Sequence, residues 1–210
     1  MSINPYLPGL ILALAVWILP LAIRLLPARI GSVFSERVPR FAEWAPWIHS
    51  IALPYLGLLL GWISSRDYGL TGHTAAEWII GIAAAAGLGI LLGKMSVRQS
   101  IGLGWGVLGD EARWTLYRAA VWPWVGYLSL AVAIGLLAGM AEFALGRRLG
   151  GEKLADEVGL LFLVHAGCSA ALFLLAHNFL LAMLLYLTAV IAATPNLQSH
   201  VLELLAKIKK

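Results

Sequence analysis

The stretch that decides the fold runs from Val158 to Ala193 and reads VGLLFLVHAGCSAALFLLAHNFLLAMLLYLTAVIAA. Its thirty-six residues include no Asp, Glu, Lys or Arg. A membrane-spanning helix needs about twenty predominantly apolar residues. Soluble domains carry charge on roughly a quarter of their residues. The stretch therefore predicts a chain that lies in a lipid bilayer.

The composition of the whole chain supports this prediction. Hydrophobic residues make up 60% of the 210 residues and charged residues only 12%. We expect an all-α, polytopic transmembrane helix bundle with five to six spans and interfacial amphipathic helices, built as one integral membrane domain over residues 1–210. The net charge of +4 comes without a basic stripe interleaved with exposed aromatics, so we expect no nucleic-acid partner. A multi-pass protein of a bacterial plasma membrane is the expected setting.

Hydrophobic and polar segments alternate along the chain. The expected spans cover residues 6–26, 47–64, 78–92 and 121–145, followed by the long apolar run. The third span holds two small-xxx-small pairs, Ala83 with Gly87 and Ala85 with Gly89, which predict the close approach of another helix. Three segments between or after the spans are polar: an interfacial loop at 27–46, a polar loop with a short helix capped by Asp110 at 94–120, and a C-terminal amphipathic helix at 195–210.

The long apolar run must be interrupted. As one straight helix it would extend about 54 Å at 1.5 Å per residue, whereas the hydrocarbon core is about 30 Å thick. We expect the break near His177 and Asn178, where the run is most polar.

The first candidate functional pair is Glu142 with Arg147. Glu142 lies near the end of the predicted fourth span among apolar neighbours, where burial would raise the pKa of a carboxyl group and suit it to act as a general base. The alternative is an interfacial glutamate that neutralises the neighbouring arginines.

The second candidate pair is Phe173 with His177, one helical turn apart on a shared face. His177 could be a hydrogen-bonded packing residue, a catalytic or cavity-lining residue, or an axial ligand of a haem or chlorophyll. Either nitrogen left unsatisfied in hydrocarbon would cost about 1–3 kcal/mol. We therefore expect a partner within hydrogen-bonding reach, drawn from Glu142, Ser169, Asn178 or His200. His165, three turns earlier, is expected to pack.

The third candidate is His200, in the predicted C-terminal helix, where the alternative is an exposed interfacial histidine. The remaining polar features predict no metal or cofactor site. The lone cysteine, Cys168, is expected to be a small buried apolar residue. The glycines at 102–109 lack the preceding strand and lysine of a phosphate loop.

Taken in order, these sites resemble the CPBP family of CAAX-protease and bacteriocin-processing intramembrane proteases. That family carries EExxxR, then FxxxH one helix later, then a histidine followed four residues on by asparagine. Glu142 and Arg147 match the first motif, Phe173 and His177 the second, and His200 the third. Phe143 stands in place of the second glutamate and Leu204 in place of the asparagine.

The resemblance implies a metal-independent, glutamic-type endopeptidase acting within the membrane on a peptide or prenylated substrate. Glu142 and His177 would activate a water molecule, and His200 would help to stabilise the oxyanion. Because two motif positions differ, an inactive relative with the same fold is an equal expectation. A further alternative is a non-enzymatic accessory subunit of a larger photosynthetic or respiratory membrane complex.

Overall fold

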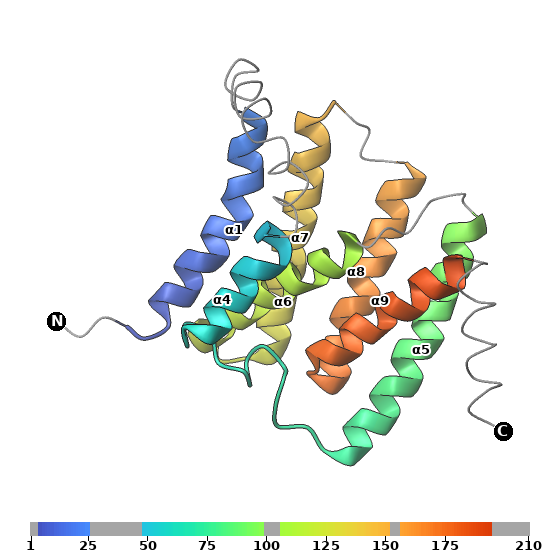
Figure 1. The fold of residues 1–210 in the computed structure, drawn as a ribbon, viewed down its shortest axis with the longest axis horizontal. Coiled ribbons are helices and arrows are strands. Elements are labelled where there is room, and N and C mark those ends of the chain that lie inside the picture. Colours follow the sequence, from blue (N-terminus) through green and yellow to red (C-terminus); the bar gives the residue numbers. More distant parts are fainter. Residues whose placement is uncertain (1–3, 26–47, 99–105, 152–155, 195–210) are drawn as a thin grey trace. The chain divides into compact units, whose positions relative to one another are not determined.

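The computed structural model describes residues 4–25, 48–98, 106–151 and 156–194. These residues form seven α-helices and one short π-helical turn, and no strand occurs among them (Figure 1). The all-α prediction is confirmed for this part of the chain. The predicted interfacial loop at 27–46 and the predicted C-terminal helix at 195–210, which carries His200, lie outside the described residues.

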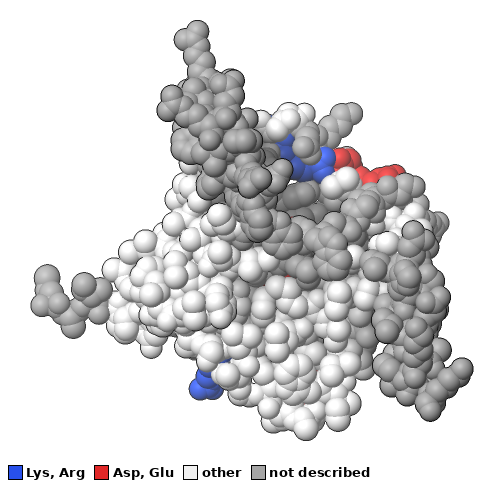
Figure 2. Space-filling model, in the orientation of Figure 1, with Lys and Arg blue, Asp and Glu red and all other residues white. Residues whose placement is uncertain are grey.

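Three helices are long and apolar enough to cross a membrane, and they indicate a membrane protein. They cover Ala75–Val97, Leu128–Leu149 and Glu157–Ala176. Three shorter apolar helices, at Leu7–Ala22, Ile48–Leu59 and Phe179–Ala193, fall below the usual length of a span. The face drawn in Figure 2 agrees, because nearly all of its described atoms belong to uncharged residues.

The chain divides into two compact units, residues 1–72 with 109–156 (unit one) and residues 73–108 with 157–210 (unit two). Unit one contains the following elements: α1 (Leu7–Leu25), the π-helical turn η1 (Ile48–Ala52), α4 (Leu53–Leu59), α6 (Gly106–Val125, from Gly109 onward) and α7 (Leu128–Leu149). Helix α1 packs against α4 and α7.

Polar side chains of unit one bond backbone carbonyls on neighbouring helices. The indole N–H of Trp17 donates to the carbonyl of Ala138 on α7 at 3.0 Å. Nε2 of His49 lies 2.6 Å from the carbonyl of Val16. Each hydrogen bond satisfies a polar side-chain group that lies between apolar helices. An unsatisfied polar group at such a position would lower the stability of the protein.

Two boundaries in unit one differ from the prediction. The fourth span begins at Leu128 and not at residue 121, because α6 continues to Val125 and the chain then turns at Gly126 with φ +73°. Glycine adopts this left-handed conformation without strain, which favours it just after a helix. Asp110 is not a helix cap, since α6 already begins at Gly106.

Unit two contains α5 (Ala75–Arg98), α8 (Glu157–Ala176) and α9 (Phe179–Ala193), with α5 packed most extensively on α9. A capping box starts α5. The backbone N–H of Thr74 donates to Oε2 of Glu77 at 2.6 Å, and the N–H of Glu77 donates to Oγ1 of Thr74 at 3.3 Å.

Glycines allow α5 and α9 to approach closely. A Cβ at Gly89 would lie 2.5 Å from the carbonyl oxygen of Leu185, whereas a Cβ at Gly87 would meet nothing within 4 Å. The pair Ala85 and Gly89 therefore forms the predicted close contact, with Ala85 fully buried. The other predicted pair, Ala83 and Gly87, makes no such close contact at Gly87.

The predicted break in the long apolar run is confirmed. Helix α8 ends at Ala176 and α9 begins at Phe179. His177 has a positive φ of +45°, and Asn178 is the N-cap of α9. Oδ1 of Asn178 accepts hydrogen bonds from the N–H groups of Leu180 and Leu181 at 2.9 and 3.3 Å. The cap replaces backbone bonds that a helix start lacks.

Candidate functional site

Helix α6 carries two polar stripes, in the segment where the sequence analysis expected a short helix capped by Asp110 after a polar loop. One stripe consists of Asp110, Arg113 and Tyr117, and the other of Glu111, Thr115 and Arg118. Both stripes follow spacings of three and four residues, so each occupies one face of the helix. That spacing was a readable signal in the sequence GDEARWTLYR.

Glu142 on α7 is buried and bonded to the first stripe. Its Oε1 accepts from Nη1 of Arg113, and its Oε2 accepts from the hydroxyl of Tyr117 at 2.8 Å. Nη2 of Arg113 also donates to Oδ1 of Asp110. Two carboxyl groups thus share one guanidinium. We call Asp110, Arg113, Tyr117 and Glu142 the acidic cluster.

The second stripe forms a fully buried ion pair inside α6. Nη1 of Arg118 donates to Oε1 of Glu111 at 3.0 Å, and the Thr115 hydroxyl donates to the same oxygen at 3.1 Å. Glu111 is 0% exposed and Arg118 1% exposed. Gly135 of α7 makes room for the arginine, since a Cβ there would lie 2.6 Å from Cγ of Arg118.

The loop after α4 is tied to α6 next to this ion pair. The hydroxyl of Tyr68 donates to the carbonyl of Ala112 at 2.9 Å. Burial, together with the negative charge of Glu111, raises the pKa of Tyr68 well above its ordinary value. The phenol therefore stays protonated and acts as a donor.

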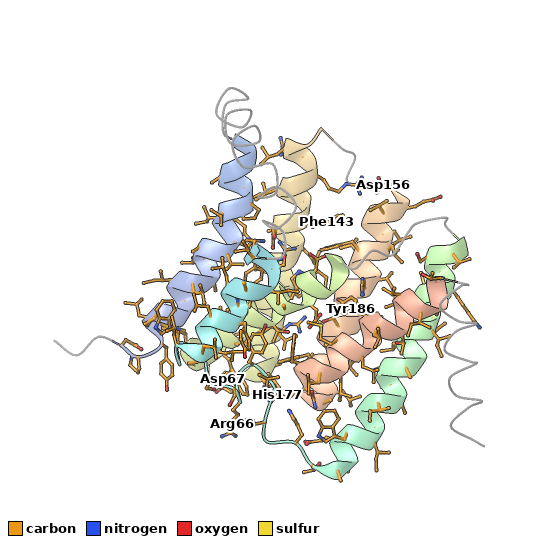
Figure 3. The ribbon with its side chains drawn as sticks, viewed as in Figure 1. Arg66, Asp67, Phe143, Asp156, His177 and Tyr186 are labelled. Carbon is orange, nitrogen blue, oxygen red and sulfur yellow. The ribbon has the colours of Figure 1, made fainter. Side chains whose placement is uncertain are left out.

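Arg147 has a different partner from the one considered in the sequence analysis. Its guanidinium forms a bidentate ion pair with Asp156, with N–O distances of 3.0 and 2.5 Å. It also lies over the ring of Phe143, 5.5 Å from the centroid. Figure 3 shows Phe143 on α7 and Asp156 just before α8. Arg147 thus pairs with Asp156, whereas Glu142 binds Arg113.

Phe173 and His177 lie together, as their spacing predicted. Their ring centroids are 5.1 Å apart with an interplanar angle of 87°. Figure 3 places His177 at the break between α8 and α9. The second neighbour of His177 is His73, with ring centroids 6.2 Å apart. The ring of His73 also contacts Trp78, at 6.1 Å.

His73 is a residue that the sequence analysis did not single out. Its signal was weak, because it lies just before a helix, where polar residues are common. His165 matches the packing role expected for it: it is 5% exposed and its ring lies 3.8 Å from that of Tyr186. Cys168 is half-buried. His200 lies outside the described residues, so its predicted role stays a prediction.

The two pairs of predicted site residues belong to different units. Glu142 and Arg147 lie in unit one, and Phe173 and His177 lie in unit two. Within the described residues, no three or more His, Cys, Asp or Glu side chains form a group that could hold a metal ion.

Comparison with known proteins adds no family. No protein-family model matches the chain, and no curated protein or solved structure matches it. The similarity to the CPBP family therefore rests on the motifs of the sequence.

Proposed function

We propose that the chain is a multi-pass membrane protein similar to the CPBP peptidases, in which the acidic cluster supplies the carboxylate of a divergent intramembrane endopeptidase. The shorter apolar helices α1, η1 with α4, and α9 would complete the five to six spans. The plasma membrane of a bacterium is the proposed location.

The observation that carries this proposal is Glu142 within α7. This helix is long and apolar enough to cross a membrane, and Glu142 is 9% exposed on it. An ionisable side chain at such a position is costly and by default marks a functional site. Glu142 is moreover bonded to two polar groups of another helix, Arg113 and Tyr117.

The chemistry requires a carboxylate that can accept a proton. A general base must be ionised at the working pH before it can accept a proton from water. Glu142 and Asp110 both accept hydrogen bonds from Arg113, so one guanidinium is divided between two carboxyl groups. The motif resemblance adds His177 as the imidazole of the reaction.

The test is hydrolysis by the purified protein in detergent. The substrates would be membrane-inserted peptides and prenylated peptides, with cleavage followed by mass spectrometry. We expect cleavage by the wild type and a loss of at least a hundredfold in rate for Glu142→Gln and for His177→Asn. Glu157→Gln, at an exposed position at the start of α8, is the matched control and should leave the rate unchanged.

A second candidate function is that of an inactive relative serving as an accessory subunit of a larger membrane complex. The observation that favours it is the engagement of both Glu142 oxygens, Oε1 by Arg113 and Oε2 by Tyr117. A carboxylate held in this way also stabilises a helix pair without any reaction. Absence of cleavage, together with a purified assembly much larger than a dimer, would favour this function over the peptidase. A visible absorption band would extend it to a pigment-bearing complex.

A further inference from the structure

A proline in α1 leaves a backbone carbonyl for a histidine to bind. Pro20 lies inside α1 and has no N–H, so it cannot donate the helical hydrogen bond to the carbonyl of Val16, four residues earlier. Nε2 of His49 lies 2.6 Å from that carbonyl oxygen. A carbonyl oxygen only accepts hydrogen bonds, so Nε2 carries a proton and donates it. The proline thus fixes both the position and the tautomer of the imidazole.

The fixed tautomer makes Nδ1 of His49 a proton acceptor. A neutral imidazole has one N–H group and one nitrogen with a free lone pair, and here Nε2 holds the N–H. Nδ1 has no hydrogen-bond partner among the residues that the structure describes. The ring is half-buried, and Nδ1 is not shut off from solvent. His49 is therefore able to take up a proton from water at Nδ1.

The imidazole lies in unit one, next to the acidic cluster. His49 belongs to the π-helical turn η1, and short π-helical segments occur frequently at functional sites. This turn packs on α6 directly before Asp110, because a Cβ at Gly109 would lie 2.6 Å from Cβ of Ser50. The packing of η1 on α6 therefore brings the histidine to the end of α6 that carries Asp110.

Two charged groups on α6 act on the imidazole of His49 in opposite senses. An ionised Asp110 favours the protonated ring, and Arg113 favours the neutral ring. The described side chains of α1 include no charged group, so this helix contributes only the carbonyl of Val16. Arg113 binds Oδ1 of Asp110, and the side chain of Asp110 is 30% exposed. Asp110 and His49 thus each offer a site at which the same proton can reside.

We propose that His49 and Asp110 together bind one exchangeable proton, through which the acidic cluster exchanges protons with water. In the exchange, an O–H bond of the Asp110 carboxyl group breaks and an N–H bond forms at Nδ1 of His49, with a water molecule between the two groups. The role of this exchange in catalysis rests on the proposed function. Glu142 gains a proton from the attacking water and loses it before the next turnover, and His49 would carry that proton to solvent. His49 acts through the carboxyl groups and does not touch the substrate.

The first test follows the protonation of His49 by nuclear magnetic resonance and needs no peptidase activity. The full chain is purified in detergent with isotope-labelled histidine, and the signal of His49 is identified by its loss in His49→Gln. We expect an Nε2–H ring at high pH. Asp110→Asn should lower the midpoint of its titration by about 0.5–1 pH unit, because a nearby carboxylate favours the charged imidazole. Asp67→Asn removes a charge that does not act on His49, and this matched control should leave the midpoint unchanged.

The second test compares two substitutions in the hydrolysis assay. His49→Gln keeps an amide N–H that can donate to the carbonyl of Val16 but takes up no proton, whereas His49→Phe loses both abilities. We expect both variants to lower the rate at least tenfold. The wild-type rate should fall as the pH drops through the His49 midpoint, because a protonated ring accepts no further proton. That inflection should be missing from the profile of His49→Gln.

Three results would overturn the proposal. They are a His49 signal that does not titrate, an equal midpoint in Asp110→Asn and Asp67→Asn, and a wild-type rate in His49→Gln with a reduced rate in His49→Phe. The third result would leave His49 only the role of binding the carbonyl of Val16. Circular dichroism establishes that each variant retains its helical content. A wild type that cleaves no substrate would contradict the proposed function, and the titration would still decide whether the two residues share a proton.

Discussion

The hydroxyl of Tyr117 on α6 donates a 2.8 Å hydrogen bond to Oε2 of Glu142 on α7. Tyr117 is 4% exposed and Glu142 9% exposed, so water does not readily replace either partner. The bond joins the two helices that carry the acidic cluster. Its donor is a neutral hydroxyl, whereas Arg113 donates charged hydrogen bonds to Glu142 and to Asp110.

Removal of this hydroxyl should destabilise the protein without removing any charge. We expect Tyr117→Phe to lower the free energy of unfolding by about 1.5–3 kcal/mol, the usual contribution of a hydrogen bond to a charged group. The measurement is denaturation in mixed detergent micelles. Tyr127→Phe is the matched control, because Tyr127 is 72% exposed, and it should change the stability little. Equal effects of the two variants would contradict the assigned role of the bond.

Removal of the guanidinium that two carboxylates share should be more damaging. We expect Arg113→Met to cost about 3–5 kcal/mol, because it leaves buried charge without its partner. The double variant Arg113→Met with Glu142→Gln should recover part of that loss, since it removes one of the stranded charges.

The control for Arg113 is Arg66→Met, at an exposed position in the loop after α4. Surface substitutions of this kind usually stay within about 0.5 kcal/mol. If the double variant is no more stable than Arg113→Met alone, Glu142 is not the group stranded by loss of the guanidinium.

Alanine substitutions at two glycines of α5, which lie about half a helical turn apart, should affect the packing of α5 on α9 differently. We expect Gly89→Ala to destabilise the protein by about 1–3 kcal/mol, as overpacking does, because its Cβ would press on the backbone of α9 at Leu185. Gly87→Ala meets nothing within 4 Å and should be neutral or stabilising by up to about 1 kcal/mol through helix propensity. Unfolding of both variants in the same micelles makes the comparison, and the reverse ranking would refute this packing.

The N-cap residue Asn178 should stabilise the first turn of α9. Asn178→Ala removes the oxygen that accepts from Leu180 and Leu181, at an expected cost of about 0.5–2 kcal/mol. Asn178→Ser keeps a capping oxygen and should restore most of the stability. Hydrogen exchange provides a local readout, with faster exchange at the amides of Leu180 and Leu181 in the alanine variant only. Unchanged exchange there would show that the cap contributes nothing.

Periodicity and length made most of the helices predictable. The charge-free run from Val158 to Ala193 is too long for one span, so a break near its most polar point follows from the thickness of a bilayer. The structure has that break at His177 and Asn178. The small-residue pair Ala85 and Gly89 likewise indicated a close helix contact, which α9 makes.

The acidic cluster was harder to predict, because charged residues in a sequence indicate solvent-exposed positions more often than a buried network. Asp110 was therefore expected only to cap a short helix, and its pairing with Arg113 on one face of that helix was not predicted. The partner of Glu142 comes from a different helix, and tertiary pairings of that kind leave no local pattern. The contact of His73 with His177 could not be predicted for the same reason, since 103 intervening residues separate them.

The contact between His73 and His177 also fixes the relative direction of two helices of unit two. Helices α5 and α8 are both long enough to cross a membrane, and the contact brings the start of one beside the end of the other. The two helices are therefore antiparallel, so that, as a pair of spans, the start of α5 and the end of α8 would reach the same side of a bilayer.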